Sequence, residues 1–159
     1  MVGHGTSRRR GRCAADSVQV PSGAEGRPNV TVAFCDSSAL VKLVVNEPES
    51  AALRHNLGTY SHVMASELAA VEVPRAIRRH DPGRVAAAHR LIRNLEAVTL
   101  DRSVLERAAA LGPSELRSVD ALQLASALRL VQFDPVFIAY DSRLVRAASA
   151  AGLRTLSPA

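Results

Sequence analysis

The fold is decided by one short stretch of the sequence, Val30-Thr31-Val32-Ala33-Phe34-Cys35-Asp36-Ser37-Ser38. Its first six residues are β-branched, aromatic or small and apolar, a composition typical of a buried strand. The last three carry side-chain oxygens that can accept hydrogen bonds from the free backbone N–H groups at the start of a helix. The stretch therefore predicts a strand that ends at Asp36 and leads directly into a helix.

The same alternation of strand and helix patterns continues along the chain. Strands are predicted at residues 30–35, 60–65, 97–100, 136–140 and 153–156. Helices are predicted at residues 36–45, 48–57, 66–80, 81–96, 101–111, 118–133 and 141–152, with Ser66 and Ser118 as N-caps. We therefore expect one α/β domain over residues 30–158, with three layers (α/β/α) and a central, mainly parallel sheet of four to five strands.

Composition fits a single globular domain. The chain has 159 residues, of which 47% are hydrophobic and 22% are charged, enough apolar material for one core. No apolar run reaches the roughly 20 residues that a membrane span requires, so no membrane association is expected. The two cysteines, Cys13 and Cys35, cannot form a disulfide framework, which predicts a reducing, cytoplasmic location.

The first 29 residues differ from the rest. They are rich in Gly, Ser, Arg and Pro without a hydrophobic period, so we expect a disordered leader or a start codon assigned too far upstream. Five of the 20 basic and two of the 15 acidic residues precede residue 30, which leaves 15 basic and 13 acidic residues. This small positive excess permits an RNA partner without requiring one.

Two acids directly follow predicted strands. Asp36 comes after residues 30–35, and Asp141 comes after residues 136–140. Ligands of open parallel sheets bind outside the carboxyl ends of the strands, where the strand order reverses. If these two strands are neighbours, the two carboxylates converge at one edge of the sheet.

A third acid, Asp120, falls near the start of the helix predicted at residues 118–133. Leu124 and Ala127 stand four and seven residues after it, so its carboxylate is expected on an inward-facing, largely apolar stripe. A simple helix cap or helix-dipole partner is the alternative interpretation.

The fourth acid, Glu72, lies in a mostly apolar helical segment, where a carboxylate needs a partner or a cation. A salt bridge to Arg75 or Arg79 is one alternative. Glu67 is another candidate for the same role, but five residues of separation rotate it about 140° around the helix, so the two cannot serve one site. Position alone does not choose between them.

Four adjacent carboxylates must either take up protons or bind divalent cations, and clusters of Asp and Glu oxygens suit Mg²⁺ or Mn²⁺. Other chemistries lack support in the sequence. It contains no Gly-rich phosphate loop, no metal-spaced Cys/His cluster and no Gly-x-Ser-x-Gly turn. A phosphotransfer domain of the receiver type would need a lysine near the last strand, whereas Lys42 falls in the first predicted helix.

Four stretches, at residues 33–42, 65–76, 116–127 and 137–144, match the motifs of a known family in order. Together they resemble PIN-domain nucleases and, among these, the VapC-type toxins of bacterial toxin–antitoxin pairs. The resemblance implies a PIN-like α/β/α fold and places the acid of the second motif at Glu72. Departures are few: Gln123 stands where the family often has His, and Ala139 where it often has Thr.

The resemblance also implies a function. The chain would be a Mg²⁺-dependent endoribonuclease toxin with catalytic acids Asp36, Glu72, Asp120 and Asp141, and Mn²⁺ could replace Mg²⁺. Asp36 and Asp120 would hold the metal, and the other two would act through water or a second ion. A homodimer and a cognate antitoxin are expected partners, besides RNA.

The rival interpretation is a catalytically inactive PIN-like module that binds RNA or a protein. RNA selection by base stacking is disfavoured because the chain has only five aromatic residues. Arginines are the alternative, and the candidates are Arg75, Arg78, Arg79, Arg117 and Arg143.

Overall fold

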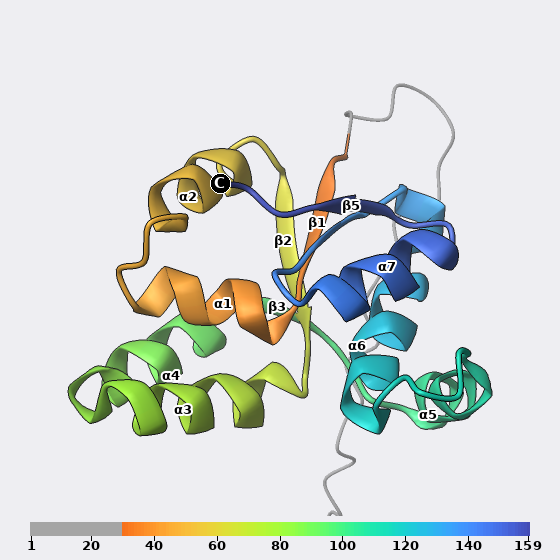
Figure 1. Cartoon of the computed structure of the whole chain (residues 1–159). Helices are drawn as coiled ribbons and strands as arrows, with labels where there is room; N and C mark the ends of the chain where they lie inside the picture. The colour runs from red at the N-terminus through yellow and green to blue at the C-terminus, as the bar shows by residue number, and fades with distance from the viewer. Residues whose placement is uncertain (1–29) are drawn as a thin grey trace, which may run out of the picture.

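A five-stranded, fully parallel sheet forms the centre of the molecule (Figure 1). The computed structural model describes residues 30–159. Neighbouring strands follow the order β3-β2-β1-β4-β5. From β1 the chain builds outward to β2 and β3 on one side and later to β4 and β5 on the other, so the strand order reverses between β1 and β4. The strands are β1 (Val32–Cys35), β2 (His62–Ser66), β3 (Glu96–Val98), β4 (Val136–Ile138) and β5 (Arg154–Leu156).

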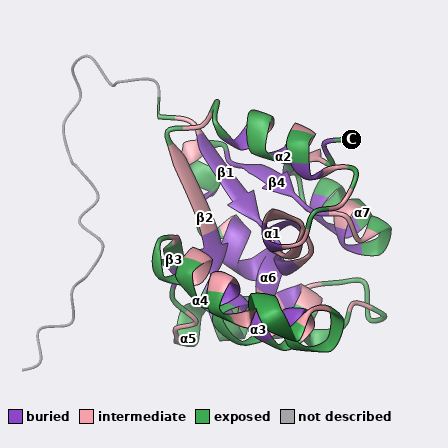
Figure 2. Cartoon of the chain, turned by 90° about the vertical axis from the view of Figure 1, so that its left-hand side faces the viewer, coloured by how far each residue is buried: buried purple, intermediate pink, exposed green. Residues whose placement is uncertain are grey.

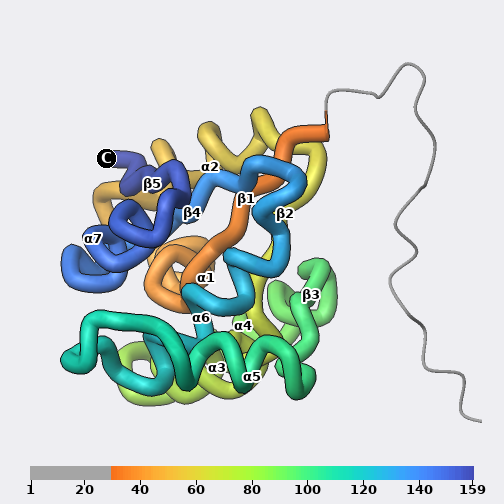
Figure 3. Tube along the Cα trace, turned by 90° about the vertical axis from the view of Figure 1, so that its right-hand side faces the viewer, coloured from red at the N-terminus to blue at the C-terminus, as the bar shows by residue number. Residues whose placement is uncertain are grey.

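Helices cover both faces of the sheet, as the three-layer prediction requires (Figures 1 and 3). One face packs against α1 (Ser37–Val44), α2 (Ser50–Leu57), α3 (Ala69–His80) and α4 (Val85–Arg93). The other packs against α6 (Ser118–Leu128) and α7 (Ser142–Ala150), and α5 (Arg102–Ala110) packs on α6. The alternation of side chains along β1 explains this: Ala33 and Cys35 enter the first core, Val32 and Phe34 the second.

The central strands are buried on both faces, as parallel strands require (Figure 2). Phe34 on β1 lies opposite Phe137 on β4, and the two rings stack with their centroids 5.6 Å apart. Neither ring is exposed to solvent. This pair fixes β1 against β4 at the place where the strand order reverses.

The number of elements agrees with the sequence-based prediction, but several boundaries were wrong. Ser66 is not an N-cap: it ends β2, its Oγ accepts from the Leu68 N–H at 3.3 Å, and α3 begins at Ala69. The N-cap position of α6 is Arg117, without a side-chain cap, so the prediction of Ser118 as the cap was also wrong.

The largest differences are at two predicted helices, where 3-10 turns replace part of the expected helix. The helix predicted at residues 81–96 is divided into a 3-10 turn (Pro82–Arg84) and α4, and β3 starts one residue earlier than predicted. The helix predicted at residues 118–133 ends at Leu128, and a 3-10 turn (Val131–Phe133) follows. Asp134 then adopts a left-handed conformation, φ 48°, which stops the turn before β4. Apolar residues continue through this turn, so hydrophobic periodicity could not locate the helix end.

Within residues 30–159, none of the helices has the length and apolar composition to cross a membrane. The leader predicted at residues 1–29 lies outside the described residues.

Candidate active site

Asp36 and Asp141 cap the two helices that leave the adjacent strands β1 and β4. Asp36 Oδ2 accepts from the Ser38 N–H at 2.9 Å, and its own N–H donates to the Ile138 carbonyl at 2.9 Å. Asp141 Oδ1 accepts from the N–H groups of Arg143 and Leu144 at 2.8 and 3.3 Å. The two carboxylates therefore stand at the switch point of the sheet, as the positions of their strands predict.

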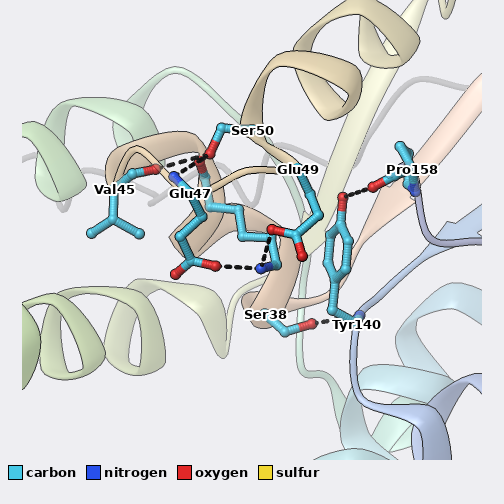
Figure 4. Close-up of polar contacts among 8 residues, drawn as sticks. Ser38, Val45, Glu47, Glu49, Ser50, Tyr140 and Pro158 are labelled. Atoms are coloured by element: carbon cyan, nitrogen blue, oxygen red, sulfur yellow. Dashed lines mark hydrogen bonds and ion pairs between the residues drawn. The ribbon is translucent and has the colours of Figure 1, made fainter.

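A polar cluster beside them holds the ends of β1 and β4 together (Figure 4). Ser38 Oγ accepts from the Tyr140 N–H at 3.0 Å, and the Tyr140 hydroxyl donates to the Pro158 carbonyl at 2.7 Å. The ammonium of Lys42 lies 4.7 Å from the centre of the Tyr140 ring and pairs with Glu47 and Glu49. Lys42 thus belongs to this cluster and is not a counter-ion of the site acids.

The other two acids reach the same region from α3 and α6. Burial, and then the negative charges of Asp36 and Asp120, raise the pKa of Glu72. Burial, followed by the charges of Asp141 and Asp36, also raises the pKa of Asp120. Each of these acids is therefore close enough to others of the set to oppose its ionisation.

Asp36 is the most deeply buried of the four, with 6% of its surface exposed. Burial is the main cause that raises its pKa, and the charge of Asp141 adds to it despite hydrogen bonds from Ser38 and Ser37. Asp141 differs: burial alone would raise its pKa, but hydrogen bonds from Arg143 and Leu144 and the charge of Arg143 lower it. The site thus combines acids that resist ionisation with one that ionises readily.

The structure distinguishes Glu72 from Glu67. Glu67 is exposed, and its Oε2 accepts from the Leu100 N–H at 2.9 Å, away from the other acids. Glu72 Oε2 accepts from Ser37 Oγ at 2.6 Å and from Gln123 Nε2 at 2.7 Å. In the described part of the chain, no salt bridge joins Glu72 to an arginine.

Asp120 lies in the first turn of α6 and is partly buried. The cap interpretation does not hold, because α6 has no side-chain cap hydrogen bond. The carboxylate instead faces the charges of Asp36 and Asp141, which raise its pKa after burial, and those of Arg117 and Arg143, which lower it.

Two residues of the site had no predicted role in it. Ser37 appeared in the sequence only as a helix-start residue, and Gln123 only as a departure from the resembled family. Both are buried, and Gln123 is only 1% exposed. The spacing of Gln123, one helical turn after Asp120, was a signal that could have found it.

A pocket of about 370 Å³ adjoins Asp120 between α6 and α7. Arg117, Arg143 and Arg146 line it, together with Glu115 and with apolar side chains that include Leu116 and Ala147. Two of these arginines were predicted RNA contacts, whereas Arg146 was not. The other three predicted contacts lie exposed on α3: Arg75, Arg78 and Arg79.

The donor chemistry of the site fits a hard divalent cation. All four side chains offer carboxylate oxygens, and the Asp36 carboxylate is buried without a basic partner among residues 30–159. No three His, Cys, Asp or Glu side chains of that range are grouped closely enough to hold one ion together. An ion held directly by two carboxylates would keep several waters, as Mg²⁺ does in many proteins.

Cysteine chemistry does not compete with this arrangement. Burial, and then the negative charge of Asp36, raise the pKa of the Cys35 thiol to about 12. The thiolate required of a nucleophile is therefore scarce at neutral pH.

Comparison with known proteins agrees with this fold. A sequence model of the PIN domain matches residues 33–150. Ribonuclease VapC46 of Mycobacterium tuberculosis is 40% identical over 125 residues, covering 79% of this chain and 96% of that protein. Ribonuclease VapC47 of the same species is 35% identical over 130 residues, with the same coverage of 79% and 96%.

The crystal structure of VapC20 of Mycobacterium tuberculosis, a toxin that cleaves the sarcin–ricin loop, has the same fold. It superposes with a TM-score of 0.63 at 21% identity and covers 80% of this chain and 100% of that one.

Proposed function

The chain belongs to the PIN-domain family, and within it to the VapC proteins, and from this we propose that it is the endoribonuclease toxin of a toxin–antitoxin pair. The observation that carries the proposal is the gathering of four acids beyond the carboxyl ends of β1 and β4, two as the N-caps of α1 and α7 and two from α3 and α6. These acids are Asp36, Glu72, Asp120 and Asp141.

The four acids suit Mg²⁺ as cofactor, with Mn²⁺ as a substitute. Asp36 and Asp120 would hold the ion, and Glu72 and Asp141 would act through bound water or a second ion. When bound, the ion supplies a water of lowered pKa as nucleophile and neutralises charge on the phosphate. Hydrolysis by such a water would break the P–O3′ bond, leaving a 3′-hydroxyl on one RNA product and a 5′-phosphate on the other.

The residues of the chain supply orientation. The Ser38 N–H orients Asp36, and the hydrogen bonds of Ser37 and Gln123 orient Glu72. Asp141 is oriented by the first turn of α7. Because strand ends and helices carry these groups, the site is organised before RNA and metal bind.

The pocket beside Asp120 supports RNA as the substrate. Its arginines, Arg117, Arg143 and Arg146, can pair with phosphate oxygens next to the scissile bond. Such contacts position the backbone without reading sequence, so the RNA that is cleaved and its cleavage sequence are not specified by them.

Cleavage of RNA by purified variants tests the proposal. Asp36→Asn and Asp120→Asn should each lower the cleavage rate at least about 100-fold, since catalytic metal ions supply several kcal/mol of stabilisation. Asp134→Asn, which alters an exposed acid of the turn before β4, is the matched control and should retain activity. EDTA should abolish cleavage, and Mg²⁺ or Mn²⁺ should restore it.

Cleavage that persists in EDTA or in both site variants would exclude this mechanism. RNA binding without cleavage by the wild type under all metal conditions would favour the inactive PIN-like module instead.

Partners and location complete the proposal. A cognate antitoxin would insert a peptide at the acids, where an arginine can meet their carboxylates, and the protein would act as a cytoplasmic homodimer. Light scattering of the purified chain tests the dimer: a monomeric mass at micromolar concentration contradicts it.

A further inference from the structure

A partly buried polar triangle joins α3 and α6, which carry Glu72 and Asp120, to α1, which Asp36 caps. Ser37 Oγ donates to Glu72 Oε2 at 2.6 Å. The Gln123 amide donates to the same oxygen at 2.7 Å and to Ser37 Oγ at 2.9 Å. The members come from α1 and α3 on one face of the sheet and from α6 on the other, so the triangle joins the two helical layers.

Each corner of the triangle is coupled to one site acid. Ser37 directly follows Asp36, Gln123 lies one helical turn after Asp120, and the third corner is Glu72 itself. A change in the triangle therefore alters the relative placement of three carboxylates that belong to separate elements.

The two carboxylate oxygens of Glu72 differ in their hydrogen bonding. Oε2 accepts both donors, whereas Oε1 accepts no hydrogen bond from residues 30–159. Two donors from separate helices hold Oε2, and Oε1 remains available to another ligand.

The Gln123 amide itself is only half satisfied. Its Oε1 atom is buried and has no partner within the described chain, whereas Nε2 lies within hydrogen-bond distance of both Ser37 Oγ and Glu72 Oε2. Rotation of the amide by 180° would place Oε1 against Glu72 Oε2, bringing two acceptors together. The amide is thus retained in a buried place for its donors, at the expense of an unpaired acceptor.

We infer that Gln123 is a positioning residue that, together with Ser37, holds Glu72 Oε2 so that Glu72 Oε1 serves the metal site. This rests on the proposed function, in which Glu72 ligates the metal through bound water or binds a second ion. Residues that orient metal ligands from behind change metal affinity by about 10- to 100-fold when they are removed.

The test measures Mn²⁺ affinity by electron paramagnetic resonance on the full chain, without RNA, together with the melting temperature. Gln123→Met keeps the length of the side chain and removes its donors. It should weaken Mn²⁺ binding about 10- to 100-fold without lowering the melting temperature, because the unpaired Oε1 atom is removed as well. A purely structural residue would change the melting temperature and leave Mn²⁺ affinity unchanged.

Ser126→Ala is the matched control. Ser126 is fully buried on the same helix and bonds to Ser66 Oγ and the Leu122 carbonyl, but does not contact Glu72. This variant should bind Mn²⁺ like the wild type. Gln123→His, which keeps one N–H donor, should bind Mn²⁺ more tightly than Gln123→Met.

Glu72→Gln separates failure of the inference from failure of the proposed function. If Glu72→Gln weakens Mn²⁺ binding but Gln123→Met does not, the inference is wrong and the proposed site stands. If Glu72→Gln leaves Mn²⁺ affinity unchanged, the proposed role of Glu72 fails, and the inference fails with it. The variant that combines Glu72→Gln with Gln123→Met should bind Mn²⁺ no more weakly than Glu72→Gln alone, because Gln123 acts only through Glu72. If Gln123→Met does not fold, Ser37→Ala is used instead, because it removes the other donor to Glu72 Oε2. It should lower Mn²⁺ affinity in the same way. Unchanged Mn²⁺ affinity of Ser37→Ala would overturn the inference.

Discussion

At the scale of single residues, the site opposes the stability of the fold, and Asp36 is the clearest case. Its pKa is raised above the usual 3.8, chiefly by burial. An acid with a raised folded-state pKa stabilises the fold while protonated, and this contribution is lost as the pH rises through the folded value. Without metal, Asp36→Asn should therefore raise the melting temperature at pH 7 by roughly 2–4 °C, the change that about 1 kcal/mol produces in a domain of this size.

Calorimetry in EDTA at pH 7 and at mildly acidic pH checks this prediction. The increase in melting temperature caused by Asp36→Asn should become smaller as the pH falls, because the wild-type carboxyl then becomes protonated. Equal melting temperatures of wild type and variant at pH 7 would contradict it.

Residue-level reasoning from the sequence located acids better than it located their partners. Asp36 and Asp141 could be predicted because a carboxylate directly after a buried strand has a defined place in a parallel sheet. The spacing from Asp120 could have placed Gln123 near the site, but its contacts could not be predicted, because its partners Ser37 and Glu72 are 86 and 51 residues away in sequence. An amide in an apolar helix has no local signature of such contacts.

At the scale of elements, the cluster around Lys42 connects α1, the start of α2 and the end of β4. Lys42 pairs with Glu47 and Glu49 and lies over the Tyr140 ring. Lys42→Met should lower the free energy of unfolding by about 1 kcal/mol, because it removes the cation that Glu47, Glu49 and the Tyr140 ring share. Urea denaturation measures the change.

The matched control is Arg102→Met, which breaks an ion pair with Glu106 on α5. Both of those side chains are largely exposed, 90% and 68%, so the free energy of unfolding should change little. Equal effects of the two substitutions would show that the Lys42 cluster does not join the elements. The motif containing Lys42 was visible in the sequence, but its contact with Tyr140 depends on β4 lying beside β1, which helix and strand patterns do not specify.

At the scale of the whole molecule, the alternation of strands and helices was sufficient to predict a three-layer domain. The alternation did not specify the strand order β3-β2-β1-β4-β5. This order places β1 beside β4 and so brings Asp36 and Asp141 together. It also sets α6 beside α7 on one face of the sheet, which creates the arginine-lined pocket next to Asp120. Because this pocket lies on the face of the sheet that α6 and α7 cover, we expect RNA contacts to concentrate on that face.

Arg146→Ala tests that expectation against Arg90→Ala, an exposed arginine of α4 on the other helical layer. Fluorescence anisotropy with a short RNA in EDTA measures binding without cleavage over a range of salt concentrations. Arg146→Ala should weaken binding and reduce the slope of log K against log salt by about 1, the loss of one phosphate contact. Arg90→Ala should leave both quantities unchanged, because α4 lies away from the pocket. If the two variants lose affinity and salt dependence equally, RNA binds through diffuse positive charge, and the α6–α7 pocket has no special part in holding it.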